Sequence, residues 1–90
     1  MRIRDVTWPT GIGEKVESKH GLSVDEVETA VLDERAYIRR AGRDRYIVLG
    51  RALEGAYIAT VVAHASGVAR VISARAMTQS ERRAYLRRGK

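Results

Sequence analysis

The longest apolar stretch lies in the second half of the chain, where residues 57–63 read Tyr-Ile-Ala-Thr-Val-Val-Ala. A near-continuous apolar run of this length is typical of a central strand covered on both faces. The Ser-Gly pair at 66–67 is a hairpin-turn signal, and residues 68–74 are predicted to return as a last strand. Residues 46–49 form a further strand, and residues 36–40 a weak edge strand. The pattern predicts an antiparallel meander.

Two short helices are predicted ahead of this meander. Residues 14–20 form a short polar helix that Gly21 closes in the usual C-cap position. Ser23 then caps a second helix, and Glu26 at its third position completes a capping box. The buried stripe of this second helix follows helical spacing and consists of Val24, Val27, Ala30 and Val31.

The two ends of the chain are predicted to be a strand and a helix. Residues 2–8 form a short strand that ends at Pro9, with Trp8 packing over an edge of the core. Glycines after Pro9 predict a loose turn there. Thr78 and Glu81 make a second capping box, which begins a C-terminal helix. The apolar side of that helix is expected to be Ala84, Tyr85 and Leu86.

The order of these elements predicts an α+β fold, with a small antiparallel sheet, two N-terminal helices and a C-terminal helix, the helices lying to one side of the sheet. Residues 1–90 are expected to form a single domain, since 90 residues suffice for one modest core. The chain contains no cysteine, which excludes disulfides and thiolate catalysis. We find no apolar run long enough to span a bilayer and no signal-peptide pattern, so we expect a cytoplasmic protein without a membrane partner.

Charge changes the picture, because the whole formal net charge of +6 resides in the last 21 residues. Such asymmetry favours a polyanionic or acidic partner. The alternative is a solvated helix whose charge keeps it soluble. One strand and one helix are expected to bring six arginines to one end of the domain: Arg70, Arg75, Arg82, Arg83, Arg87 and Arg88.

Candidate catalytic groups are few. Neither His20 nor His64 belongs to a His-Glu-x-x-His pattern and the acids are scattered, so we expect no metal site and no cofactor. RNA cleavage needs only a base for the 2′-hydroxyl, an acid for the leaving 5′-oxygen, and cations for the phosphate charge. His20 could be either base or acid, or merely a polar residue at a helix end, and His64 is expected to be structural. Arg70 and Arg75 would hold phosphate oxygens.

Two motifs resemble the BrnT family of type II toxin–antitoxin ribonucleases, which share the RelE/ParE-like fold. The first is Trp8 followed twelve positions later by His20, within the Lys-His-Gly-Leu segment 19–22. The second is Arg-Val-Ile-Ser-Ala-Arg at 70–75 followed by Thr-x-x-Glu-Arg-Arg-x-Tyr at 78–85. Between them, Arg-Tyr-Ile-Val-Leu-Gly at 45–50 matches a family strand. The resemblance covers about residues 8 to 88 in register.

The resemblance implies metal-independent cleavage of mRNA, and hence inhibition of translation. It also implies a cognate antitoxin of the ribbon-helix-helix type that covers the basic face. DNA would be contacted only indirectly, through the antitoxin, and a homodimer or a toxin–antitoxin hetero-oligomer would be the assembly. The implied catalytic residues are Lys19, His20, Arg70 and Arg75. The resemblance also places Arg45 on the active surface, where we expect it to bind RNA. From the charge distribution we expect the arginines of the C-terminal helix to bind RNA as well: Arg82, Arg83, Arg87 and Arg88.

The chain departs from the family pattern at Pro9, Ile12, Val16 and Ala76, where polar residues are usual. These departures leave open an alternative, a catalytically weak or inactive toxin homologue that binds RNA or a protein partner through its basic C-terminal face. A gyrase-type inhibitor on the related ParE-like scaffold is a further alternative that no residue supports directly.

Overall fold

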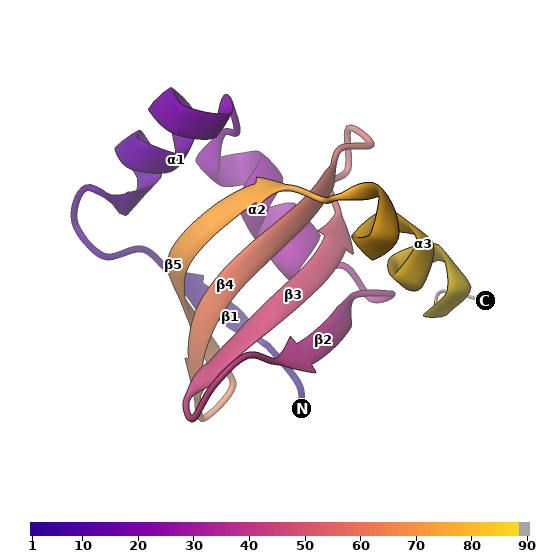
Figure 1. Cartoon of the computed structure of the whole chain (residues 1–90). Helices are drawn as coiled ribbons and strands as arrows, with labels where there is room; N and C mark the ends of the chain where they lie inside the picture. The colour runs from indigo at the N-terminus through magenta and orange to yellow at the C-terminus, as the bar shows by residue number, and fades with distance from the viewer. Residues whose placement is uncertain (89–90) are drawn as a thin grey trace.

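The computed structural model describes residues 1–88 and shows a five-stranded sheet with helices on both faces (Figure 1). The spatial order of the strands is β1-β5-β4-β3-β2, so the apolar run predicted to be central is indeed the middle strand β4. The strands are β1 (Asp5–Thr7), β2 (Tyr37–Arg40), β3 (Arg45–Arg51), β4 (Tyr57–Ala65) and β5 (Val68–Ala76). The helices are α1 (Ile12–His20), α2 (Val24–Val31) and α3 (Gln79–Arg88).

The α+β prediction is confirmed, and β2 to β5 form the expected antiparallel meander. At the β4–β5 turn Ser66 and Gly67 both have positive φ angles, 52° and 82°. A two-residue hairpin turn of this kind matches the twist of its strands, and only glycine and a few polar residues adopt it readily. β2 lies at the sheet edge, as its weak pattern indicated.

The first strand is shorter than predicted and differs in direction from the rest of the sheet. Only residues 5–7 pair, and they run parallel to β5 with Val6 opposite Ala69. The backbone N–H of Arg4 donates to the Gly67 carbonyl at 2.7 Å, which ties the N-terminal segment to the β4–β5 turn. The sheet is therefore mixed, with one parallel edge strand added to the meander.

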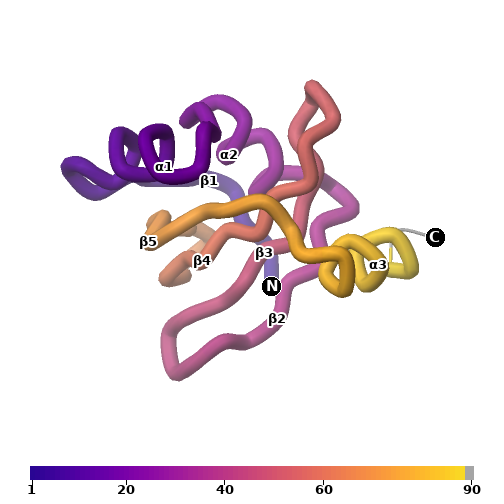
Figure 2. Tube along the Cα trace, turned by 45° about the horizontal axis from the view of Figure 1, so that its top comes forward, coloured from indigo at the N-terminus to yellow at the C-terminus, as the bar shows by residue number. Residues whose placement is uncertain are grey.

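Helices cover opposite faces of the sheet, so the expectation that they lie to one side is wrong. α2 buries Val27 against Ile58 and Val62 of β4, whereas α3 buries Tyr85 against Leu49 on the other face. Two cores form because β4 alternates its side chains between the faces. Figure 2 shows α1 beside β5 and α3 at the opposite side of the sheet, near β2 and β3.

Both predicted capping boxes are present. The Ser23 hydroxyl accepts the Glu26 N–H at 3.1 Å and Glu26 returns the contact to the Ser23 N–H at 3.0 Å. Thr78 and Glu81 repeat the arrangement at the start of α3. These contacts satisfy backbone donors that a helix N-terminus otherwise leaves without partners.

Two details of the helices correct the sequence reading. α1 begins at Ile12 rather than 14, so Gly13 belongs to the helix and not to a loose turn; Gly21 ends the helix as expected. Leu86 is 47% exposed, so it does not belong to the buried side of α3, which consists of Ala84 and Tyr85. Within residues 1–88 no helix has the length and apolar character needed to cross a membrane.

A β-bulge in β5 decides which side chains share a face. Val61 pairs with Ser73 but Val62 pairs with Val71, so Ile72 is an extra residue in β5. On a regular strand Arg70 and Arg75, five positions apart, would point to opposite faces. The bulge instead places Arg70, Ser73 and Arg75 opposite the same-face β4 residues Ala63, Val61 and Ala59, on the face that carries α3.

Candidate active site

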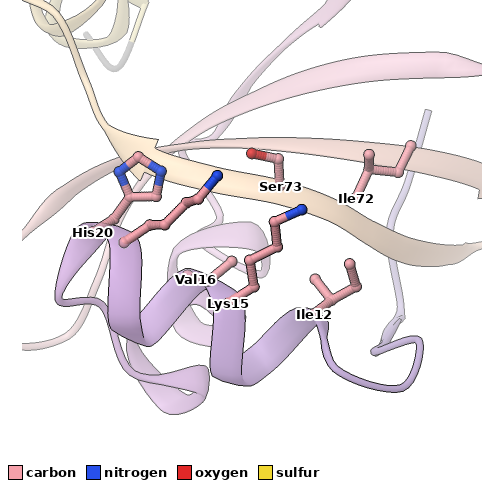
Figure 3. A pocket seen from close by; sticks show the side chains of 7 residues that line it. Ile12, Lys15, Val16, His20, Ile72 and Ser73 are labelled. Carbon is pink, nitrogen blue, oxygen red and sulfur yellow. The ribbon is translucent and has the colours of Figure 1, made fainter.

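A hollow of about 180 Å³ lies between α1 and β5 (Figure 3). Helix α1 packs against β5, and residues spaced three or four apart on a helix share one face. Ile72 and Ser73 form the strand side of the hollow, and Figure 3 shows the helix residues reaching toward them. The helix side consists of Ile12, Lys15, Val16, Lys19 and His20.

The predicted pair Lys19 and His20 therefore reaches the sheet. Both are exposed residues in the last turn of α1, where cationic side chains interact favourably with the helix dipole. Gly21, with φ 67°, ends the helix and donates its N–H to the Glu17 carbonyl at 2.9 Å. That left-handed cap fixes the end of α1 beside the bulge of β5.

The two predicted phosphate ligands lie on either side of this hollow rather than inside it. Arg70 precedes Ser73 by three residues and Arg75 follows it by two, and all three share a face. Their β4 partners, Ala63 and Ala59, place the two arginines about 13 Å apart along the strand. The four predicted catalytic residues thus gather along one strand edge without meeting in a single pocket.

Arg70 is also remote from α3, so the expectation of six arginines at one end of the domain is wrong. It borders a separate depression with Thr7, Asp44 and His64 near the β4–β5 turn. Arg45 joins it there, because Arg45 and Arg70 pair with Ala63 from opposite sides and point to the same face. Arg45, which was predicted to bind RNA, and Arg70, which was predicted to be catalytic, thus lie close together on the sheet.

Arg75 forms a bidentate salt bridge with Glu81. Its Nη1 and Nη2 donate to the two carboxylate oxygens of Glu81 at 2.6 and 2.9 Å, and Nη1 also donates to the Ala76 carbonyl at 3.2 Å. These hydrogen bonds from Arg75, together with the Thr78 N–H, lower the pKa of Glu81 to about 2, and the same pair raises the pKa of Arg75. Bidentate contacts of this kind fix the plane of a guanidinium.

The α3 arginines fall into two groups. All four are exposed, but Arg82 stacks over the Tyr57 ring at 4.2 Å and Arg88 over the Tyr37 ring at 5.1 Å, whereas among residues 1–88 Arg83 and Arg87 have no such ring contact. Arg51 and Arg39 approach the same two rings, each at 5.1 Å. Stacking holds a guanidinium plane while leaving its N–H donors free for hydrogen bonds. Lys90, which contributes to the C-terminal charge, lies outside the described residues.

Sequence reasoning missed two residues that line the hollow. Lys15 precedes Lys19 by four positions, a spacing that places both on one helix face and could have been recognised. Ser73 could not, because its orientation depends on the bulge. Within residues 1–88 no group of three or more His, Cys, Asp or Glu could hold a metal ion.

His64 and Trp8 have the structural surroundings that were expected. The His64 ring packs edge-on against Tyr46 with centroids 6.1 Å apart. Trp8 packs at the margin of the core and donates its Nε1–H to Glu28 at 2.7 Å. Both side chains thus serve packing on the face away from α3.

Comparison with known proteins decides the family. The sequence profile described as "Ribonuclease toxin, BrnT, of type II toxin-antitoxin system" matches residues 12–81, which is most of the chain.

The chain belongs to the BrnT family.

A solved structure supports the assignment at the level of the fold. The crystal structure of the Brucella abortus ribonuclease toxin BrnT superposes with a TM-score of 0.67, covering 83% of this chain and 97% of that one at 22% identity. A search of curated proteins finds no match. The resemblance seen in the motifs is thus confirmed, and so is the fold that it implied.

The structure shows where the four residues that depart from the BrnT pattern lie. Ile12 and Val16 form an apolar wall of the hollow. Because Val16 is only 4% exposed, it also belongs to the core. The Pro9 carbonyl accepts the Ile12 N–H at 3.1 Å as α1 begins. Ala76, whose carbonyl accepts an N–H of Arg75, is the last residue of β5, shortly before α3 begins. The hollow is therefore less polar than the family pattern provides, while its basic residues remain.

Proposed function

We propose that this BrnT family member is an endoribonuclease toxin that cleaves RNA through attack of a 2′-hydroxyl, without a metal ion, and so inhibits translation. The observation that carries the proposal is the gathering of Lys19 and His20 beside Ser73, between Arg70 and Arg75, along the edge of β5 where α1 meets the basic face. These residues supply a proton-transfer group and cations at the edge of an open sheet surface, where a strand of RNA has access.

The proposed reaction uses only these groups. A base removes the 2′-hydroxyl proton, the 2′-oxygen bonds to the adjacent phosphorus, and the bond to the 5′-oxygen breaks as an acid gives that oxygen a proton. The products are a 2′,3′-cyclic phosphate and a free 5′-hydroxyl. His20 serves as base or acid, and Lys19 and Arg75 stabilise the charge that develops on the phosphate oxygens.

The rest of the basic face would bind the RNA backbone. Arg45 and Arg70 form one pair of phosphate ligands at the hairpin end of the sheet. The α3 arginines at 82, 83, 87 and 88 form another group beyond Arg75. Membership of a type II toxin–antitoxin family supports a cognate antitoxin as the second partner. We propose that the antitoxin is of the ribbon-helix-helix type, covers this face, and provides the only contact with DNA.

A second candidate function is an RNA- or protein-binding homologue with weak or no catalysis. Two observations favour it: the apolar residues Ile12 and Val16 in the hollow, and the engagement of Arg75 by Glu81. Both functions require the same basic face, so only a cleavage assay separates them.

The test is incubation of a structured RNA with the purified protein in EDTA, alongside His20→Ala, Arg75→Ala and a charge-matched control, Arg43→Ala. Arg43 is exposed in the β2–β3 turn, outside the hollow. We expect wild type and the control to cleave equally, and the other two variants to lose about 100-fold or more in rate while remaining folded. RNA binding without cleavage by wild type would instead establish the binding homologue.

A further inference from the structure

The Arg75–Glu81 pair specifies which part of the guanidinium is available to a substrate. An arginine side chain has five N–H donors in a planar fork. In Arg75 both Nη1 donors are used, on Glu81 and on the Ala76 carbonyl, and one Nη2 donor is used on Glu81. Among residues 1–88, the donors that remain without a partner are Nε–H and the second Nη2–H. These two lie side by side on one edge of the plane, spaced to grip two oxygens of one phosphate.

Glu81 is held rigidly enough to impose this arrangement. Its side chain is only 12% exposed, compared with 40% for Arg75. One carboxylate oxygen also accepts the backbone N–H of Thr78 at 2.9 Å, a contact that does not depend on the Thr78 side chain. The Thr78 hydroxyl instead accepts the backbone N–H of Glu81 at 3.1 Å and so caps the helix without touching the carboxylate. The same carboxylate therefore caps the N-terminus of α3 and fixes the orientation of the Arg75 guanidinium.

We infer that Glu81 is a positioning residue, which holds Arg75 so that its Nε/Nη2 edge binds the phosphate of an RNA strand. The inference rests on the proposed ribonuclease function and deepens it, since it assigns an orientation to one phosphate ligand. Glu81 itself does not touch the RNA. Its role is to prevent the guanidinium from rotating out of the geometry that the reaction needs, where small displacements lower rates strongly.

The decisive variant is Glu81→Gln. A glutamine can still accept one N–H from Arg75 through its carbonyl oxygen, but its amide group faces the second guanidinium nitrogen with a donor instead of an acceptor. The arginine stays charged and stays in place on β5 but loses its fixed plane. We expect the rate constant for cleavage to fall about 10- to 100-fold while KM changes little. Glu81→Asp, which keeps both carboxylate oxygens, should recover part of the loss.

Thr78→Ala is the matched control. It removes the other half of the capping box, the hydroxyl that accepts the Glu81 N–H, but leaves both contacts between Glu81 and Arg75. Its effect on the stability of α3 should resemble that of Glu81→Gln, whereas its cleavage rate should remain near that of wild type. Equal losses of activity in the two variants would show that only the helix cap matters, and would overturn the inference.

A measurement without cleavage separates this inference from the proposed function. NMR of the Arg75 Nε–H group is recorded with a 2′-O-methyl RNA oligonucleotide, which cannot be cleaved because it lacks the attacking hydroxyl. We expect the RNA to shift the Nε–H signal and slow its exchange in wild type and Thr78→Ala, and to do neither in Glu81→Gln.

Two results would show that the inference is wrong. One is an Nε–H signal of wild type that does not change when RNA binds, and the other is a Glu81→Gln protein that cleaves as fast as wild type or faster. A protein that shows the shift but does not cleave would refute the ribonuclease proposal alone.

Discussion

At the scale of single residues, the protonation of the Glu81 carboxylate makes the free energy of unfolding depend on pH. Its pKa falls from the usual 4.5 to about 2 because it accepts hydrogen bonds from Arg75 and from the backbone of Thr78. The folded state therefore prefers the ionised form more strongly than the unfolded state does. This stabilisation is complete above about pH 4.5 and disappears as the pH falls through the folded-state pKa, near 2.

The Glu81→Gln variant should consequently lose less stability in acid than wild type does. At pH 6 we expect wild type to be more stable by about 1–2 kcal/mol, a modest value because Arg75 is partly exposed and solvent screens the pair. The difference should shrink steadily between pH 4.5 and pH 2. Urea unfolding of both proteins across this range measures it, and a difference that is independent of pH would contradict the assigned cause.

At the scale of elements, helix α2 packs against β3 so closely that the strand needs a glycine. A Cβ added to Gly50 would overlap the carbonyl oxygen of Ala30 in α2, so the helix or the strand would have to move. Interiors tolerate such overpacking poorly, because few gaps exist to absorb the shift. This contact packs α2 closely against β3 on the face of the sheet opposite α3.

Gly50→Ala should therefore destabilise the domain by about 2–3 kcal/mol. Gly42→Ala is the control, since a Cβ at Gly42 would meet nothing nearer than the Arg45 Cβ at 3.7 Å. That substitution should change the free energy of unfolding by less than about 0.5 kcal/mol. Chemical denaturation of the two variants provides the comparison, and equal stabilities would refute the packing argument.

The helices and the meander could be predicted from the sequence because their signals are local. Ser23 with Glu26, and Thr78 with Glu81, act within one helical turn, and the apolar run of β4 needs no distant partner to be recognised. The bulge at Ile72 could not be predicted, because it is defined by pairing with β4 and not by a glycine or proline in β5. For the same reason, the sequence predicts that Arg70 and Arg75 act together but does not reveal the bulge that places them on the same face of the sheet.

The second role of Glu81 escaped prediction for a related reason. Its capping position was recognised from spacing along the helix, but its contact with Arg75 depends on how α3 turns back from the end of β5. The parallel pairing of β1 was missed because residues 5–7 meet residues 68–70 only in the folded sheet. Local patterns thus determine the elements, and tertiary contacts determine the orientation of the candidate site.

At the scale of the molecule, charge is separated between the two faces of the sheet. The face that carries α3 presents arginines from several strands, among them Arg39, Arg45, Arg70 and Arg75. The helices on the other face contribute acids, of which Glu14, Glu17 and Asp25 are exposed and Glu26 and Glu28 are half-buried. A polyanion should therefore approach the face that carries α3 and the adjoining edge of β5, where Lys15 and Lys19 lie.

The affinity for single-stranded RNA should fall with salt, with a slope in log–log form of about −0.7 for each phosphate neutralised. Replacing both Arg45 and Arg70 by alanine should make that slope shallower by about 1.4, whereas Arg43→Ala should leave it unchanged. Fluorescence anisotropy with a 2′-O-methyl oligonucleotide at several salt concentrations measures the slopes. A wild-type affinity that is insensitive to salt would rule out phosphate binding by this face.

The pairing of β1 with β5 also has a kinetic consequence. Contacts between segments so far apart in sequence raise contact order, and such contacts form late because a long loop must close first. The strand β5 also supplies Ser73, Arg70 and Arg75 to the basic face. A nascent chain that stops short of β5 would thus have α1 with Lys19 and His20 but no surface on which to use them. The basic face can therefore form only once residues 68–76 have been synthesised.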